Sequence, residues 1–394
     1  MRSLHTDTEE DEESDLILAL LLWEKRTFVH SWNRKAFYGT LDLLHRRRRQ
    51  RKIPTSALLP PHQSSWRRMY MGGSDAAMIT FTGLDHRSFE ELNTSFQVLF
   101  DAYTPHGKDG IIRRVGKAGR KRVVTSSDCL ALVLSWTRTR GGMFVLQIIF
   151  GLSASTVSEY IRFGRRLLIE IMNKDEAAQV RIPPAEKIAE YNRAVEARHP
   201  ALKKVWMTMD GLKLYLEQSP NCLLQSRYYN GWTHDHYVTN ILGFCPAGTI
   251  VVACVNVPGC IHDSTVCEWG NIYTQLGKVH AETGGTCTVD SAFSKKKCDF
   301  LIKSSQTLPE SPEEIIVNAD ATSMRQSAEW GMRSFQVSFP RIKDRIVYEE
   351  NGERRLLLKM LVLLFNYRAN KVGISQFKNT YMPSLERLGN DIRN

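Results

Sequence analysis

The chain has 394 residues, 42% of them hydrophobic, and its 53 Lys and Arg outnumber 42 Asp and Glu for a formal net charge of +11. A chain of this length and composition can bury a substantial core, which excludes a wholly disordered protein and predicts two domains with tails. The positive charge fits a polyanionic partner such as nucleic acid, although many soluble proteins are also basic.

The first 64 residues are predicted to be a partly disordered tail with a short helix. Residues 1–15 are strongly acidic, and residues 16–44 look helical. The apolar run at 16–23 is too short for a membrane span, and the chain does not open with a basic segment followed by an apolar one. We therefore expect a soluble protein without a signal peptide. The run HRRRRQRKIP at 45–54 fits either a solvated segment or a nuclear localisation signal, and on the second reading the protein is nuclear.

The eight cysteines form no Cys-x-x-Cys pair, which favours a reducing compartment and free thiols. Cys254, Cys260, His262 and Cys267 are close in sequence. Their spacing matches no common structural zinc pattern, so we do not expect zinc here.

Residues 65–200 are predicted to be a helical domain containing a helix-turn-helix. SSDCLALVLSWTRT reads as a helix capped by Ser126 or Ser127, and MFVLQIIFGLSASTVSEYIRFGRRLL reads as two helices joined by a turn at 151–153. An ordinary helical hairpin is the alternative, but the basic run at 113–122 favours DNA binding. The candidate DNA contacts are Ser153, Ser155, Thr156, Ser158, Arg162, Arg165 and Arg166.

After residue 197 the pattern changes from helical to strand-rich. Three strands, a helix, a fourth strand and further helices are predicted, at residues 205–216, 227–248, 249–259, 262–277, 286–293 and from about 322 onward. This order predicts a mixed α/β (α+β) fold with flanking helices.

The first strand, VWMTMDGLKLYL, is apolar on both faces, yet Asp210 lies in its middle. An ionised carboxylate there is costly unless it is paired, hydrogen-bonded or bound to a metal. Asp290 ends the fourth strand. If the first and fourth strands are neighbours, as in an RNase H-like fold, the two carboxylates can share a divalent cation. Oxygen ligands suit Mg²⁺ or Mn²⁺.

A third carboxylate, Glu329, falls on a later helix. Arg325 and Arg333 lie one turn before and after it, and the apolar stripe of the helix consists of Met324, Ala328, Met332 and Phe335. This stripe predicts a helix that packs on the sheet and presents Glu329 near the two aspartates.

In the order and spacing of these pieces, the chain resembles a PIF/Harbinger-type transposase of the DDE superfamily and the related domesticated Harbinger-derived nucleases. The resemblance covers residues 65–385 and is carried by MDG at 209–211, PGCIHDSTV at 258–266, VDSAF at 289–293 and RQSAEWGMRSF at 325–335. It implies an RNase H-like nuclease domain at 201–385, a C-terminal tail at 386–394, and a catalytic, metal-binding triad of Asp210, Asp290 and Glu329.

Asp263 has two interpretations. It opens a helix after Pro258-Gly259, where an acidic N-cap or N1 residue interacts favourably with the helix dipole. Alternatively it is a secondary metal ligand that orients a ligand or a substrate phosphate, with His262 as a proton-transfer or phosphate contact.

The resemblance implies a metal-dependent DNA endonuclease and transposase that cuts double-stranded DNA at transposon ends and catalyses strand transfer. It implies a Myb-like accessory DNA-binding protein, it leaves a homo-oligomer as one option, and it implies no membrane partner. Two alternatives stay open: a domesticated or inactive transposase-derived nuclear DNA-binding protein, and an RNase H-like nuclease acting on RNA or a hybrid. The candidate DNA backbone contacts near the triad are Arg325, Arg333, Lys295, Lys296 and Lys297.

Overall fold

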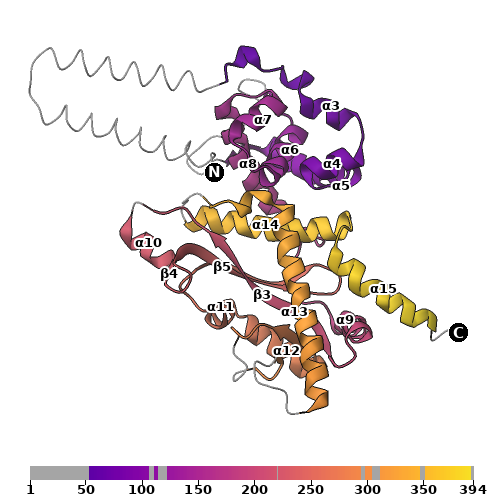
Figure 1. The fold of residues 1–394 in the computed structure, drawn as a ribbon. Coiled ribbons are helices and arrows are strands. Elements are labelled where there is room, and N and C mark those ends of the chain that lie inside the picture. Colours follow the sequence, from indigo (N-terminus) through magenta and orange to yellow (C-terminus); the bar gives the residue numbers. More distant parts are fainter. Residues whose placement is uncertain are drawn as a thin grey trace, which may run out of the picture.

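The computed structural model describes residues 53–105, 111–113, 122–219, 221–293, 298–303, 311–346 and 351–391. Several predictions fall outside these residues: the acidic tail, the helix at 16–44, most of the basic run at 45–54, residues 114–121 of the second basic run, and Lys295, Lys296 and Lys297. Figure 1 shows a group of N-terminal helices next to a sheet that carries helices on both faces.

Short helices make up the described N-terminal part. They are η1 (Thr55–Ala57), η2 (Pro61–Gln63), α3 (Ser65–Met71), α4 (Asp75–Thr82), α5 (His86–Ala102), α6 (Ser126–Arg138), α7 (Met143–Phe150) and α8 (Ala154–Met172), with a small antiparallel pair of β1 (Tyr103–Thr104) and β2 (Ile112–Arg113). On α5, Phe89, Leu92 and Phe96 follow helical spacing and are buried, so this face of the helix packs in the core.

The N-cap of α6 is Thr125 and not Ser126 or Ser127, so that prediction was wrong by one or two residues. The Thr125 hydroxyl accepts a hydrogen bond from the Asp128 amide, and the Asp128 carboxylate accepts one from the Thr125 amide. This reciprocal capping box needs an acidic or amide side chain at the third helical position, and only Thr125 as cap places Asp128 there.

The helices α7 and α8 are separated by three residues, and the chain bends by 97° between them. Gly151 ends α7 in the left-handed conformation, at φ 67°, and a Cβ there would lie 2.1 Å from the Leu59 carbonyl oxygen. Ser153 then caps α8. The two predicted helices and the turn at 151–153 are therefore present. Within the described part of the chain, no single helix is long and apolar enough to cross a membrane, and α7 and α8 meet that criterion only as a bent pair.

A mixed six-stranded sheet follows, with β3 (Val205–Tyr215) in its centre. The order is β4-β5-β3-β7-β8, and β6 pairs with β5. β3 is antiparallel to β5 and parallel to β7, which confirms that the first and fourth predicted strands are neighbours. The other strands are β4 (Tyr229–Asn230), β5 (Asp235–Phe244), β6 (Ile250–Pro258), β7 (Thr286–Val289) and β8 (Leu301–Lys303).

Helices cover both faces of this sheet (Figure 1). The even-numbered residues Leu212 and Leu214 of β3 pack in one hydrophobic cluster with α13 and α14, whereas Met207 and Met209 pack in a second cluster with α9, α11 and α12. The helices are α9 (Ala185–Arg198), α10 (Cys222–Tyr228), α11 (Asp263–Trp269), α12 (Ile272–Thr283), α13 (Pro312–Ser338), η3 (Pro340–Lys343), α14 (Asn351–Lys371) and α15 (Gln376–Asp391). The cluster around α14 also includes residues of α6 and α8, so the N-terminal helices and the sheet share a core.

Two helices have boundaries that differ from the prediction. The helix expected from about 322 begins at Pro312, because the Ser311 hydroxyl accepts the Glu314 amide at 3.3 Å and Pro312 occupies the first turn. The single helix expected at 262–277 is divided into α11 and α12, because Asn271, at φ 56°, turns the chain between them.

Candidate active site

Asp210 and Asp290 are placed next to each other by strand pairing. In the parallel ladder of β3 and β7, Thr208 is opposite Thr288 and Met209 is opposite Val289. Asp210 follows Met209 within β3, and Asp290 is the first residue after the end of β7. Neighbouring residues in a ladder point to the same face, so the two side chains extend from the sheet together, toward α13. The strand order that was the condition for bringing the two carboxylates together is therefore present, and the charge of Asp290 acts on Asp210.

Burial and like charges both act on Asp210. Burial raises its pKa to about 6, and the negative charges of Asp290 and Asp263 add to this rise. The Gly211 amide, which donates to Asp210 Oδ1 at 2.7 Å, and the Arg325 guanidinium act in the opposite direction. Asp210 is thus a half-buried carboxylate whose charge is only partly compensated, the state that a bound cation would relieve.

The turn after β7 fixes Asp290. The Phe293 amide donates to the Asp290 carbonyl oxygen at 3.2 Å, and the Phe293 ring is fully buried. Lys303 of β8 donates to the Ser291 carbonyl oxygen at 3.1 Å. A buried aromatic anchor three residues beyond the carboxylate holds the turn against the second hydrophobic cluster, so Asp290 lies on a defined stretch of backbone.

Glu329 lies on α13, as predicted, and its neighbours Met324, Ala328 and Met332 are buried. The helix approaches the sheet closely at Gly331, where a Cβ would lie 2.8 Å from the Phe244 ring. The Glu329 carboxylate itself is directed outward: 55% of its side chain is exposed, and Oε1 is paired with Arg325 Nη1 at 3.0 Å.

Arg325 connects the sheet carboxylates with Glu329. Its guanidinium lowers the pKa of Asp210 and is ion-paired with Glu329, one helical turn later. Its side chain is 26% exposed. The structure therefore places Arg325 among the carboxylates, where the sequence analysis expected a DNA contact, whereas Arg333 is exposed on the same helix.

Asp263 reaches the same region from the opposite face of the sheet. His262 is the N-cap of α11 and Asp263 its first residue, which agrees with the helix-start interpretation. The carboxylate lies against Gly211, where a Cβ would be 2.9 Å from Oδ2. Burial raises the pKa of Asp263, Asp290 raises it further, and His262 and Lys213 lower it. The position at the helix start and the approach to the aspartates are therefore both present.

The structure also adds residues that the sequence analysis missed. Gly211 gives Asp263 the room to approach, and Lys213 supplies a positive charge beside it. Alternation along β3 was the available signal, because positions 211 and 213 share the face opposite to Asp210.

In the residues that the structure describes, no three His, Cys, Asp or Glu side chains are close enough together to hold a metal ion as they stand. The donor set nevertheless fits a hard divalent cation. It consists of carboxylate oxygens and concentrates negative charge around a half-buried Asp210, and Arg325, whose charge acts on Asp210, is paired with Glu329.

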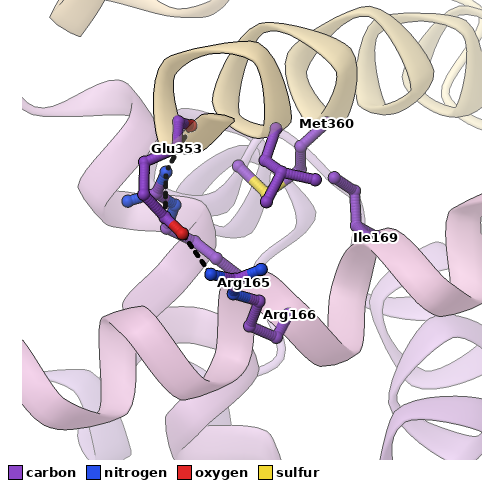
Figure 2. Close-up of a pocket in the computed structure, with 6 residues that line it drawn as sticks. Arg165, Arg166, Ile169, Glu353 and Met360 are labelled. Atoms are coloured by element: carbon purple, nitrogen blue, oxygen red, sulfur yellow. Dashed lines mark hydrogen bonds and ion pairs between the residues drawn. The ribbon is translucent and has the colours of Figure 1, made fainter. Parts of the chain in front are cut away.

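The candidate DNA contacts on α8 divide into two groups. Ser155, Ser158 and Arg162 are exposed, and Ser153 and Thr156 are half-buried at the helix start, where Ser153 accepts the Thr156 amide. By contrast, Arg165 and Arg166 reach Glu353 of α14, as Figure 2 shows. Arg165 also donates to the Glu353 carbonyl oxygen at 3.3 Å. Those two arginines join α8 to α14.

Comparison with known families matches residues 209–366 to the DDE superfamily endonucleases. The match begins one residue before Asp210, ends within α14, and includes Asp263, Asp290 and Glu329. The mixed sheet with helices on both faces is consistent with the fold of such nucleases. No curated protein and no solved structure matches the chain. Residues 209–366 are therefore similar to the DDE superfamily endonucleases, a family that acts on DNA and generally uses divalent metals.

Proposed function

We propose that this protein is a metal-dependent DNA endonuclease of the PIF/Harbinger transposase type, which cleaves phosphodiester bonds at transposon ends and catalyses strand transfer in the nucleus. The single observation that supports it most is the pairing of β3 with β7, which puts Asp210 and Asp290 side by side within the segment that matches the endonuclease family.

In this proposal Asp210, Asp290 and Glu329 hold Mg²⁺ or Mn²⁺, and Asp263 orients the group or provides a further oxygen. When bound, the cation would supply the positive charge that activates an attacking water or 3′-hydroxyl and stabilises the leaving oxygen. The protein's part is to hold three carboxylates at one end of the central strand. For Glu329 to take part, its side chain must leave Arg325 and turn toward Asp210. The guanidinium is then available to a phosphate oxygen.

Double-stranded DNA is the proposed substrate, with α7 and α8 as a helix-turn-helix that presents Ser155, Ser158 and Arg162 to it. Exposed side chains at the start of the second helix are where such motifs contact base edges and phosphates. A Myb-like accessory protein and a homo-oligomer belong to the same proposal and rest on the resemblance alone.

The test is nicking of supercoiled plasmid by the full chain in Mg²⁺, with Asp210→Asn and Asp290→Asn compared with Arg87→Gln, a control on exposed surface. Loss of cleavage in both aspartate variants, with DNA binding retained and no fall in the thermal unfolding temperature, supports the proposal. Calorimetric titration with Mg²⁺ in the absence of DNA gives an independent measurement, since both variants should bind the cation more weakly.

A second candidate is a DNA-binding protein whose carboxylate site is inactive. The observation in its favour is that Glu329 is 55% exposed and paired with Arg325 instead of facing the aspartates. Binding of DNA by the wild-type protein without cleavage in Mg²⁺ or Mn²⁺ distinguishes this candidate from the first.

A further inference from the structure

The loop between β4 and β5 carries Trp232, whose side chain is almost fully exposed to solvent. Trp232 is 92% exposed, and the neighbouring Leu223 and Tyr229 are 77% and 40% exposed. In Figure 1, α10 and β4 project from one end of the sheet, away from α9 and α13. An indole in water gives up the stabilisation that burial provides, so exposed apolar and aromatic side chains in such a place are typical of a contact surface.

Hydrogen bonds hold the backbone of this loop, whereas the Trp232 side chain is exposed. Asn230 Oδ1 accepts hydrogen bonds from the Trp232 amide at 3.0 Å and from the Thr233 amide at 3.1 Å. His234, at φ 54°, turns the chain back into β5. The backbone that carries Trp232 is therefore fixed, and a ligand that stacks on the indole does not have to order the loop first.

The loop is also connected to the candidate active site. Asn230 Nδ2 donates to the Gly259 carbonyl oxygen at 2.7 Å, and the chain continues from Gly259 to His262 and Asp263. Along β5, Leu242 is seven positions after Asp235 and is opposite Asp210 in the ladder. Seven residues of strand span about 23 Å, so an extended polynucleotide strand reaches from one place to the other over several nucleotides.

The charge of this region favours a polyanion over an acidic protein surface or a neutral one. Residues 219–234 contain no Asp or Glu, and Arg227 is exposed in the same stretch. The next acidic residue, Asp235, is neutralised by Arg345, with Nη2 to Oδ2 at 2.7 Å. An aromatic face beside positive charge, without acidic neighbours, is the combination that binds single-stranded nucleic acid by stacking on bases.

We propose that Trp232 is a base-stacking residue, which holds an unpaired base of the DNA strand whose phosphate lies at the carboxylate site, while Arg227 contacts the adjoining backbone. This inference rests on the proposed function, because it takes DNA as the substrate. In this proposal the β4–β5 loop binds the frayed or single-stranded part of the substrate, and the helix-turn-helix binds the duplex part.

The experiment measures binding of the full chain to two labelled probes in Ca²⁺, a blunt duplex and the same duplex with a six-nucleotide 3′ overhang containing 2-aminopurine. Trp232→Ala should weaken binding of the overhang probe by about 5- to 100-fold and leave the blunt probe unchanged. It should also abolish the quenching of 2-aminopurine. Trp232→Phe should keep most of both signals. Trp269→Ala is the matched control, because Trp269 is 64% exposed but lies at the end of α11.

Equal binding of both probes by wild type and Trp232→Ala overturns the inference. Loss of self-association in sedimentation by Trp232→Ala, with DNA binding unchanged, also overturns it and assigns the surface to a protein contact. Failure of the proposed function has a different signature. In that case the wild-type protein shows stacking on the overhang probe but does not nick plasmid in Mg²⁺.

Discussion

Gly211 and Asp263 are in contact across the sheet surface: a Cβ on Gly211 would lie 2.9 Å from Asp263 Oδ2 and 3.2 Å from its carboxyl carbon. Gly211→Ala should therefore push the Asp263 carboxylate away from Asp210 and Asp290. We expect weaker Mg²⁺ binding by calorimetry and slower plasmid nicking, with a folded protein by circular dichroism.

Gly352→Ala is the control for this change, because a Cβ at Gly352 meets nothing within 4 Å. It should leave Mg²⁺ binding unchanged. If Gly211→Ala binds Mg²⁺ as tightly as Gly352→Ala does, Asp263 has no part in holding the cation and only its helix-start role remains.

Stability should depend on pH through Asp210. Its pKa is about 6 in the folded protein against 3.8 as the ordinary value, so the folded state binds this proton more tightly than the unfolded state. The resulting stabilisation is complete below about pH 4 and is lost as pH rises through 6. Without metal, Asp210→Asn should raise the free energy of unfolding at pH 7.5 by up to about 3 kcal/mol and change it little at pH 4.

Urea unfolding in EDTA at the two pH values measures this difference. Adding Mg²⁺ at pH 7.5 should stabilise the wild-type protein and not Asp210→Asn, since the amide lacks the charge that binds the cation. An equal effect of the substitution at both pH values would mean that the ionised Asp210 carboxylate is not what destabilises the folded protein at pH 7.5.

Arg325 should behave as a counterion for the metal-free site. It lowers the pKa of Asp210 and pairs with Glu329 at 3.0 Å. Arg325→Gln leaves the carboxylates with less positive charge around them, so the unfolding temperature in EDTA should fall and the increase on adding Mg²⁺ should exceed that of wild type. Arg333→Gln, on the exposed side of the same helix, should change neither value. Identical Mg²⁺ shifts in the two variants would exclude this role.

The arginines of α8 should separate into binding and structural residues. Arg162 is exposed, so Arg162→Ala should weaken duplex binding and leave stability unchanged. The slope of the logarithm of the binding constant against the logarithm of the salt concentration should become shallower by about one. Arg166 is paired with Glu353 (Figure 2), so Arg166→Ala should cost about 1 kcal/mol of stability. Filter binding over a salt series and urea unfolding measure the two effects. The assignment fails if Arg166→Ala changes the salt dependence and Arg162→Ala does not.

The sequence predicted those parts of the site that depend on strand order and helix periodicity. Asp210 within an apolar strand and Asp290 at a strand end could be placed together once the two strands were taken as neighbours, and β3 and β7 are. The buried stripe of Met324, Ala328 and Met332 likewise follows from a period of 3.6 residues.

Contacts between elements could not be predicted in the same way. The approach of Asp263 to Gly211 depends on how α11 packs on the face opposite to Asp210, and no local pattern specifies that packing. The Glu329 side chain points outward because it pairs with Arg325 and does not turn toward the aspartates. Helix spacing alone does not predict which of these two directions it takes. The division of Arg162 from Arg166 required the position of α14, which follows α8 by almost two hundred residues.

The pairing of β3 with β7 also determines when the two aspartates can come together during synthesis of the chain. Thr208 and Thr288 meet in the ladder although 80 residues separate them, and α13 follows later still. A ribosome that stops in this interval releases a central strand with one open, apolar edge and an incomplete set of acidic groups. The truncated product is then an aggregation-prone fragment that lacks the complete group of carboxylates.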